Sequence, residues 1–317
     1  MDSNKVHDVV MVGAGPSALA AAVYTTREDI ETVVFEKGVI GGMAAITDQV
    51  DNYPGFPDGV EGMKLAELLQ KQAERFGAVI DYGEVSEIRE DGDIKTLVVD
   101  GKDVQAKAVL IATGSDYKRT GVPGEDEFFG RGVHYCATCD GAFYRDKKLV
   151  VIGGGNSAFQ EALFLTRFAS HIDILVRSEI KASEVLIRDM QKFIDEGKVT
   201  VHLQAETQEI TAQDGKVNGV RAMVAGKETV FDTDGVFVFV GLLPNTGFLK
   251  DSTIELDAQG LIKTNAHLQT SMKGVFASGD VRSGATLQIA SAVGEGASAA
   301  LAIREYLDDA KRMSEIK

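Results

Sequence analysis

The fold of this chain follows from one stretch of its sequence, Val9-Val10-Met11-Val12-Gly13-Ala14-Gly15-Pro16-Ser17-Ala18. An apolar run leads into closely spaced glycines, an alanine-rich stretch follows, and a second apolar run ends at Glu36. This order predicts a strand, a tight turn, a helix and a second strand, the unit that binds a dinucleotide. Gly13 permits the turn, Gly15 lets the backbone approach a pyrophosphate, and Ala18 permits close packing of helix on strand. Glu36 follows at about 20 residues' distance, where a carboxylate accepts hydrogen bonds from ribose hydroxyls.

A second copy of this pattern lies further along the chain. Leu149-Val150-Val151-Ile152 leads into Gly153-Gly154-Gly155-Asn156-Ser157-Ala158, and a second strand is expected over Ile172–Val176. The two copies keep a constant offset, so that Ser17 matches Ser157. Side chains that match along the expected helices argue against two unrelated glycine turns. The chain therefore holds two dinucleotide-binding folds, for two dinucleotides or for one dinucleotide and a relic site.

The two copies differ at the position whose side chain would bind the ribose. Val176 stands where the first copy has Glu36, and Arg177 follows it. The first site thus keeps the carboxylate that binds a free ribose diol, whereas the second has lost it and placed a cation nearby. A cation suits a 2′-phosphate. The alternative is that Arg177 is a solvated arginine at a strand end, and both interpretations stay open.

The segment 133–141, between the copies, carries the most reactive residues. It contains both cysteines of the chain, Cys136 and Cys139, at a spacing that permits a reversible intramolecular disulfide. Thiol–disulfide exchange needs one thiolate to attack and a second sulfur to resolve the mixed disulfide. Asp140 is placed to move a proton on or off a leaving thiolate. A zinc half-site with His134 lacks a second cysteine pair, so the sequence favours redox chemistry and no metal.

Composition excludes several classes of protein. The 317 residues include 33 Lys and Arg against 48 Asp and Glu, a net charge of −15, which argues against nucleic acid or an anionic membrane as a partner. No apolar run approaches the roughly 20 residues that span a bilayer. A strand-like segment begins almost at once, so we expect no secretory signal. Two cysteines also rule out a disulfide-stapled scaffold, and the expected location is cytoplasmic.

Taken together, the motifs resemble the low-molecular-weight bacterial and archaeal thioredoxin reductases, flavin-dependent pyridine nucleotide-disulfide oxidoreductases. The resemblance covers essentially the whole chain. It is carried by the first glycine motif, Glu36-Lys37, Gly41-Gly42, Asp51-Asn52-Tyr53-Pro54-Gly55, Ala112-Thr113-Gly114, Cys136-Ala137-Thr138-Cys139-Asp140 and Gly279-Asp280.

The resemblance implies an α/β fold with two Rossmann-like, three-layer ββα dinucleotide-binding domains, the second inserted into the first. Residues 1–116 and 246–317 would form a discontinuous FAD-binding domain. Residues 117–245 would form the NAD(P)H-binding domain, which carries the cysteine pair. Because that pair belongs to the inserted domain, the resemblance also implies that this domain rotates to bring either the disulfide or the nicotinamide to the flavin.

The same resemblance assigns the cofactor sites. Asp280 would bond the ribityl chain or the pyrophosphate of FAD, and Gln288 with Ile289 would lie near the isoalloxazine. The residues assigned to FAD are Gly13, Gly15, Pro16, Ser17, Ala18, Glu36, Lys37, Gly41, Gly42, Met43, Asn52, Val85, Ala112, Thr113, Gly114, Gly279, Asp280, Gln288 and Ile289. Those assigned to NAD(P)H are Gly153, Gly155, Asn156, Ser157, Ala158, Arg177, Lys181 and Gly241.

The implied activity is thioredoxin-disulfide reduction. Electrons would pass from a nicotinamide cofactor through FAD and the Cys136/Cys139 disulfide to thioredoxin or a thioredoxin-like protein. Cys139 would face the flavin, Cys136 would attack the protein substrate, and Asp140 would serve as acid and base. The resemblance further implies a homodimer.

The electron donor is the point where the sequence departs from the family. NADPH-dependent members usually carry His-Arg-Arg and a further arginine four residues on, whereas this chain has Leu175, Val176, Arg177 and Lys181. NADPH is the predicted donor, with NADH or reduced ferredoxin as alternatives. Two other classes stay open: a flavoenzyme like ferredoxin–NADP reductase, which would not need the cysteines, and a flavoprotein without turnover.

Overall fold

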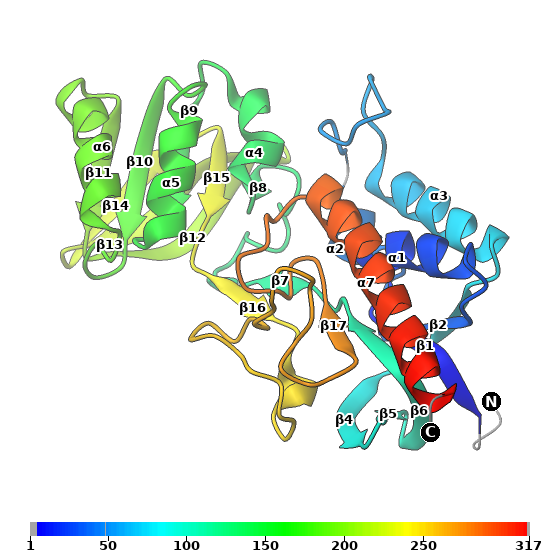
Figure 1. Ribbon diagram of the computed structural model, residues 1–317. Coiled ribbons are helices and arrows are strands. Elements are labelled where there is room, and N and C mark those ends of the chain that lie inside the picture. The colour runs from blue at the N-terminus through cyan, green and yellow to red at the C-terminus, as the bar shows by residue number, and fades with distance from the viewer. Residues whose placement is uncertain (1–4, 48, 316–317) are drawn as a thin grey trace. The chain divides into compact units, whose positions relative to one another are not determined.

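The computed structural model describes residues 5–47 and 49–315 of the chain, which folds as two compact units (Figure 1). The first unit consists of Met1–Asp116 together with Leu243–Lys317, and the second unit is Tyr117–Leu242. The second unit is therefore inserted into the chain of the first. The two segments that join the units, β7 (Ser115–Tyr117) and β16 (Leu242–Pro244), pair with each other.

The first unit is built on a sheet of order β3-β2-β1-β6-β5-β4, in which β17 also pairs with β6. The strands are β1 (Val6–Val12), β2 (Thr32–Glu36), β3 (Val79–Tyr82), β4 (Val85–Asp91), β5 (Ile94–Val99), β6 (Lys102–Ile111) and β17 (Val275–Ala277). Strands β1, β2, β3 and β17 run parallel to their neighbours, while β4 and β5 extend β6 as an antiparallel hairpin. The long β6 thus joins a parallel half to an antiparallel half.

Alternation along β1 explains the three layers of this unit. Val9 and Met11 pack against a helical layer made of α1 (Pro16–Thr26), α3 (Gly62–Arg75) and α7 (Ile289–Glu315). Val10 and Val12 pack on the opposite face, against the β4–β5 hairpin and the segment that follows η2 (Gly247–Leu249). A central parallel strand buried on both faces needs such a continuous apolar run.

The second unit repeats this plan around a parallel sheet of order β11-β10-β9-β15-β8. Helices α5 and α6 cover one face, and an antiparallel sheet of order β12-β13-β14 covers the other. The elements are β8 (Val133–His134), β9 (Lys148–Ile152), α5 (Asn156–Leu165), β10 (His171–Val176), α6 (Glu184–Asp195), β11 (Val199–Leu203), β12 (Ala205–Gln213), β13 (Lys216–Val224), β14 (Lys227–Asp232) and β15 (Gly235–Val238). The predicted fold class, two Rossmann-like three-layer folds, is confirmed.

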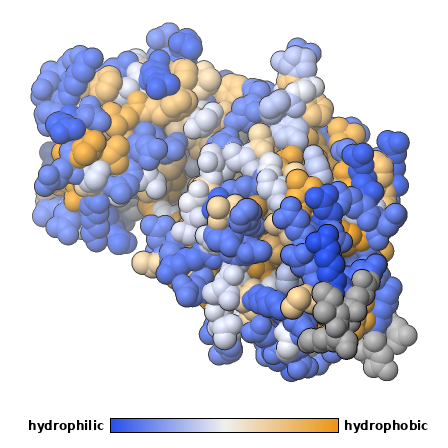
Figure 2. All heavy atoms as spheres, in the orientation of Figure 1, coloured by the Kyte–Doolittle hydropathy of each residue, from blue (hydrophilic) through white to orange (hydrophobic). Residues whose placement is uncertain are grey.

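The apolar faces of the helices and strands are turned inward, so the surface should be mostly hydrophilic. The face in Figure 2 is mostly hydrophilic, and hydrophobic residues gather there only in small groups. Within residues 5–47 and 49–315, none of the helices combines the length and the apolar character that crossing a bilayer requires.

Helices α1 and α7 lie side by side and pack closely (Figure 1). Gly296 of α7 makes this contact possible, because a Cβ atom there would lie 2.0 Å from the carbonyl oxygen of Ser17 in α1. Gly294, two residues earlier on the same helix, faces open space. The approach of the two backbones therefore depends on one glycine and not on its neighbour.

We expect Gly296→Ala to lower the free energy of unfolding by about 1–3 kcal/mol, the usual cost of overpacking. Gly294→Ala is the matched control and should be neutral or stabilising by up to about 1 kcal/mol, because alanine favours a helix over glycine. Denaturant unfolding of both variants measures the difference. Equal stability of the two variants would contradict this account of the helix contact.

Candidate active site

The redox centre lies in the second unit, between β8 and the short helix α4 (Ala137–Asp140). Cys136 precedes α4 and forms a disulfide with Cys139. The backbone N–H of Cys139 donates to the sulfur of Cys136 across 3.2 Å. On reduction, that amide would stabilise a thiolate on Cys136, since a hydrogen bond to a charged form favours it. The sequence prediction that these two cysteines pair agrees with the structure.

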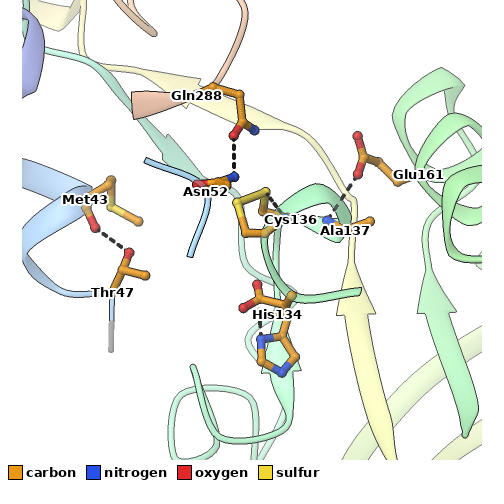
Figure 3. The surroundings of a disulfide bond; sticks show 10 residues. Met43, Thr47, Asn52, His134, Cys136, Ala137, Glu161 and Gln288 are labelled. Atoms are coloured by element: carbon orange, nitrogen blue, oxygen red, sulfur yellow. Dashed lines mark hydrogen bonds and ion pairs between the residues drawn. A yellow bond between two sulfur atoms is a disulfide. The ribbon is translucent and has the colours of Figure 1, made fainter. Parts of the chain in front are cut away.

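Two carboxylates lie at helix α4, which contains Cys139 of the disulfide: Asp140 is its last residue, and Glu161 contacts its first. Asp140 lies 3.3 Å from Nδ1 of His134, and Glu161 of α5 accepts a hydrogen bond from the N–H of Ala137 at 3.1 Å (Figure 3). Burial raises the pKa of Glu161, against the lowering effect of the Ala137 amide. His134, considered above as a zinc ligand, instead faces Asp140. In the part of the chain that the structure describes, no group of three or more His, Cys, Asp or Glu side chains could hold a metal ion.

The first glycine turn joins β1 to α1. Gly13 has φ +92°, and a Cβ atom there would lie 2.6 Å from the carbonyl oxygen of Ala112, so only glycine fits. Gly15 precedes α1, and Gly42 lies opposite it, at the start of α2 (Gly42–Ala45). A Cβ atom on Gly42 would approach the Cα of Gly15 at 3.8 Å, so the two glycines line one open space. Amide groups at a helix start beside such a space suit a pyrophosphate.

Glu36 stands at the end of β2, beside this turn. Its Oε2 accepts the N–H of Ala14 at 2.7 Å and its Oε1 accepts the N–H of Gly38 at 2.7 Å, which fixes the carboxylate. The carboxylate lines a cavity of about 540 Å³. Residues of the first unit that line it include the predicted Gly13, Lys37, Val85 and Thr113, and also Phe248 and Lys250, which the sequence analysis missed. The cavity is of the size that small-molecule sites have.

Asp280 follows a turn at Gly279, whose φ is +74°. Its Oδ1 atom is buried and has no hydrogen-bond partner within the described residues. Burial, together with the charge of Glu295, raises the pKa of Asp280 to about 6. Glu295 itself accepts the N–H of Gly279 at 2.8 Å and pairs with Arg282. A buried carboxylate oxygen without a partner calls for a donor from a bound molecule, and the hydroxyls of a ribityl chain fit that need.

Four further predicted residues form hydrogen bonds in the first unit, two of them with each other. Asn52 donates to Oε1 of Gln288 at 3.0 Å, just before α7, while the carbonyl of Met43 accepts from Thr47 (Figure 3). Ser17 and Ser278, both buried, share a hydrogen bond of 2.6 Å.

The remaining predicted FAD residues occupy the turns and ends of elements in the same unit. These are Pro16 and Ala18 in α1, Lys37 after β2, Gly41 before α2, Ala112 to Gly114 after β6, and Ile289 at the start of α7. Asn245 exchanges two hydrogen bonds with Thr113, whereas the sequence analysis placed it at the domain boundary and not in the site. Glu295 was also missed, although it is the only acid in the Gly- and Ala-rich stretch 289–303 and was a usable signal.

The second glycine turn joins β9 to α5. Gly153 has φ +148°, and a Cβ atom there would lie 2.4 Å from the carbonyl oxygen of Phe239, whereas Gly155 faces open space. Asn156 accepts the N–H of Ser183 at 2.7 Å, which ties the loop after β10 to this turn. The other residues assigned to this site are Ser157 and Ala158 in α5 and Gly241 after β15, with φ +121°.

Arg177 and Lys181 follow β10 and are exposed. Neither side chain forms an ion pair with any other residue of the ranges 5–47 and 49–315, so both are available to an anion. Val176, in contrast, is 1% exposed and belongs to the helix-side core of the second unit. Its side chain packs over Gly154, where a Cβ atom would meet it at 2.5 Å. Where the family usually has three arginines, this chain therefore offers the two exposed cations Arg177 and Lys181.

Comparison with known proteins shows that this chain is similar to disulfide oxidoreductases over nearly its whole length. The family described as pyridine nucleotide-disulphide oxidoreductase matches residues 7–296. A thioredoxin reductase of Bacillus subtilis is 40% identical over 312 residues, which cover 98% of this chain and 97% of the relative. One of Listeria monocytogenes is 38% identical over 98% of this chain and 97% of its own length. The crystal structure of thioredoxin reductase from Streptococcus pyogenes has a TM-score of 0.90 at 38% identity, covering 96% of this chain and 99% of that one.

Two dinucleotide-binding folds and a disulfide between closely spaced cysteines define a nucleotide-dependent disulfide oxidoreductase as the class of protein. The chain belongs to the pyridine nucleotide-disulphide oxidoreductase family and, within it, to the thioredoxin reductases. It is an oxidoreductase that acts on a sulfur group, and the family is one of flavoproteins.

The raised pKa of Asp280 predicts how the stability of the flavin-free protein depends on pH. The folded protein keeps the Asp280 proton up to about pH 6, whereas the unfolded chain loses it near the ordinary value of 3.8. The stability from this group is therefore complete below about pH 4 and is lost as the pH rises through 6, an effect of about 3 kcal/mol. The unfolding free energy of the wild type minus that of Asp280→Asn should fall by this amount between about pH 4 and pH 8.

Denaturant unfolding at several pH values measures this difference. The matched control is Asp251→Asn, whose carboxylate is 75% exposed in the same unit and should show no comparable change. A difference between wild type and Asp280→Asn that does not vary with pH would refute the assignment of a buried, unpartnered carboxyl.

Proposed function

We propose that the protein is a thioredoxin-disulfide reductase that uses FAD and takes its electrons from NADPH. The observation that carries the proposal is the Cys136–Cys139 disulfide beside Asp140, in the unit that also holds the second glycine turn. A disulfide at this spacing passes two electrons to another disulfide by exchange. The names of the relatives support thioredoxin as the recipient.

The exchange can be written with its atoms balanced. The thiolate of Cys136 attacks one sulfur of the thioredoxin disulfide, so that a mixed disulfide forms and one substrate thiolate leaves. Asp140 takes the proton of the Cys139 thiol, and the resulting thiolate attacks the sulfur of Cys136. The second substrate thiolate leaves, and the Cys136–Cys139 disulfide forms again. The two leaving thiolates end as thiols, one with the proton that Asp140 passes on and the other with a proton from water.

The first unit fits FAD. Gly13, Gly15 and Gly42 would face the pyrophosphate, Glu36 the adenosine ribose, and Asp280 the ribityl chain. When bound, FAD supplies a two-electron carrier between the nucleotide and the disulfide. The support is the open space between glycines, the cavity beside Glu36, and the unpartnered buried Oδ1 of Asp280.

The second unit supports NADPH over NADH through Arg177 and Lys181. A 2′-phosphate needs a matching charge, and both exposed cations follow β10, where the ribose of a bound nucleotide would lie. NADH would need a carboxylate at the position that Val176 fills, and Val176 is buried in the core. The lysine lacks the planar fork of the family's usual arginine, so the Michaelis constant for NADPH should be high.

The homodimer rests on the resemblance alone, whereas the location rests on the use of the cysteines. We propose a homodimer and a cytoplasmic location, the latter because the chain uses its two cysteines for redox chemistry and not as structural staples. A flavoenzyme like ferredoxin–NADP reductase is disfavoured, since such an enzyme has no use for the cysteine pair. Reduced ferredoxin as donor stays an outcome of the experiment below.

The roles of the two cysteines predict which variant traps the substrate. Cys139→Ser, once reduced, should form a stable mixed disulfide between Cys136 and thioredoxin, because no second sulfur can resolve it. Cys136→Ser should form none and, like Cys139→Ser, should lose catalytic turnover. Non-reducing electrophoresis after mixing with oxidised thioredoxin detects the adduct. An adduct with Cys136→Ser alone would reverse the assignment, and failure of the wild type to reduce thioredoxin would remove the proposed function.

The donor assignment predicts a change in the Michaelis constant. Arg177→Ala and Lys181→Ala should each raise it for NADPH by about tenfold, since one charge-assisted bond to phosphate contributes roughly 1.4 kcal/mol or more. The value for NADH should hardly change. Arg188→Ala removes an exposed cation from α6 and serves as the control. If reduced ferredoxin reduces the protein while neither nucleotide does, the reductase assignment stands and the donor assignment is wrong.

A further inference from the structure

Asp140 is not an isolated acid, because it stands at the end of a chain of contacts that joins three polar side chains. Nδ1 of His134 lies 3.3 Å from Oδ2 of Asp140, and Nε2 of the same ring lies 2.7 Å from the hydroxyl of Tyr144. They come from β8, α4 and η1 (Gly141–Tyr144), all in the second unit. The His134 side chain is 7% exposed and that of Asp140 is 23% exposed.

The packing around His134 holds its ring in one orientation. Tyr144 meets the ring edge-on at 5.3 Å between centroids, and Phe237 of β15 packs against it at 5.2 Å. Tyr144 is itself seated on Gly235, where a Cβ atom would lie 2.3 Å from the tyrosine ring. The imidazole therefore cannot turn without disturbing two aromatic neighbours.

The chemistry of the three groups assigns the protons. Burial, together with the charges of Asp140 and Asp234, raises the pKa of Tyr144 to about 12, so its hydroxyl keeps its proton near neutral pH. When that hydroxyl donates to Nε2, the imidazole carries its proton on Nδ1, and this N–H is directed at Asp140. The charged or titratable groups around His134 are thus Asp140 of α4 and Tyr144 of η1, with Asp234 acting through Tyr144. Phe237 of β15 carries no charge.

We propose that His134 is a positioning residue for Asp140 and that Tyr144 fixes its tautomer. In this arrangement the Nδ1–H of His134 faces Oδ2 of Asp140 and leaves the second carboxylate oxygen, Oδ1, to act on the cysteines. Oδ1 takes the proton of the Cys139 thiol, Cys139 attacks the mixed disulfide on Cys136, and the proton passes from Oδ1 to the leaving thiolate. This inference rests on the proposed function for the roles of the two cysteines.

The test is a single turnover that needs neither a nucleotide nor thioredoxin. The holoenzyme is reduced with dithiothreitol, freed of the reductant and mixed with one equivalent of 5,5′-dithiobis(2-nitrobenzoate). Its leaving thiolate needs no proton, because thiols of low pKa leave readily. The first release of nitrothiobenzoate reports the attack by Cys136, and the second release reports the resolution by Cys139, which needs Asp140 as a base.

His134→Phe should slow the second release on the order of tenfold or more, within the range of general base catalysis, and leave the first nearly unchanged. His134→Asn offers an N–H near the position of Nδ1 and should restore much of the second rate. Tyr144→Phe, which retains the imidazole, should give a smaller loss in the second release only.

The matched control is His202→Asn. His202 also pairs with a carboxylate, Asp173, at 2.7 Å, but it lies on β11, at the opposite edge of the same sheet from β8. Neither release should change in this variant. Equal slowing of both releases in His134→Phe, no slowing of either, or failure of His134→Asn to restore the second would overturn the proposal. Failure of the wild type to reduce thioredoxin would instead refute the proposed function. The two outcomes are distinguishable because the single turnover contains no thioredoxin.

Discussion

The close approach of backbone to backbone at two glycine turns is the constraint on which the rest of the structure depends. At Gly13 the chain passes so near the carbonyl of Ala112 that no Cβ atom fits, and at Gly153 it passes equally near the carbonyl of Phe239. Each approach lets a strand end and a helix begin beside open space, with free amide groups facing it. A side chain at either position would collide with that carbonyl and push the two backbone segments apart.

The same turn supports two different sites because the strand that follows it ends differently. In the first unit β2 ends in Glu36, whose carboxylate is fixed by two backbone amides and lines a cavity. In the second unit β10 ends in Val176, which is part of the core, and the exposed cations Arg177 and Lys181, which we propose as the nucleotide-recognising residues, lie beyond it. Both copies thus retain the glycine turn, whereas the residue at the end of the following strand differs.

The redox centre is assembled within the second unit from short elements. A four-residue helix holds the disulfide, an amide of that helix faces the sulfur of Cys136, and Glu161 receives its first N–H. Below it, His134 and Tyr144 extend the contacts of Asp140 into a buried aromatic cluster. Such short elements have little stability of their own, so the core around Phe237 must hold these groups in place.

The two glycine turns, the strand–helix–strand order around each and the pairing of the cysteines could be predicted from the sequence alone. These features are local, and each depends on residue types at fixed spacing. The insertion of one fold into the other was expected only from the resemblance to a known family. The tertiary structure was needed to show that Oδ1 of Asp280 is buried without a partner among the described residues, that Glu295 accepts the amide of Gly279, and that His134 faces Asp140 and Tyr144. Burial and side-chain direction depend on which distant elements pack together, and no local pattern contains that information.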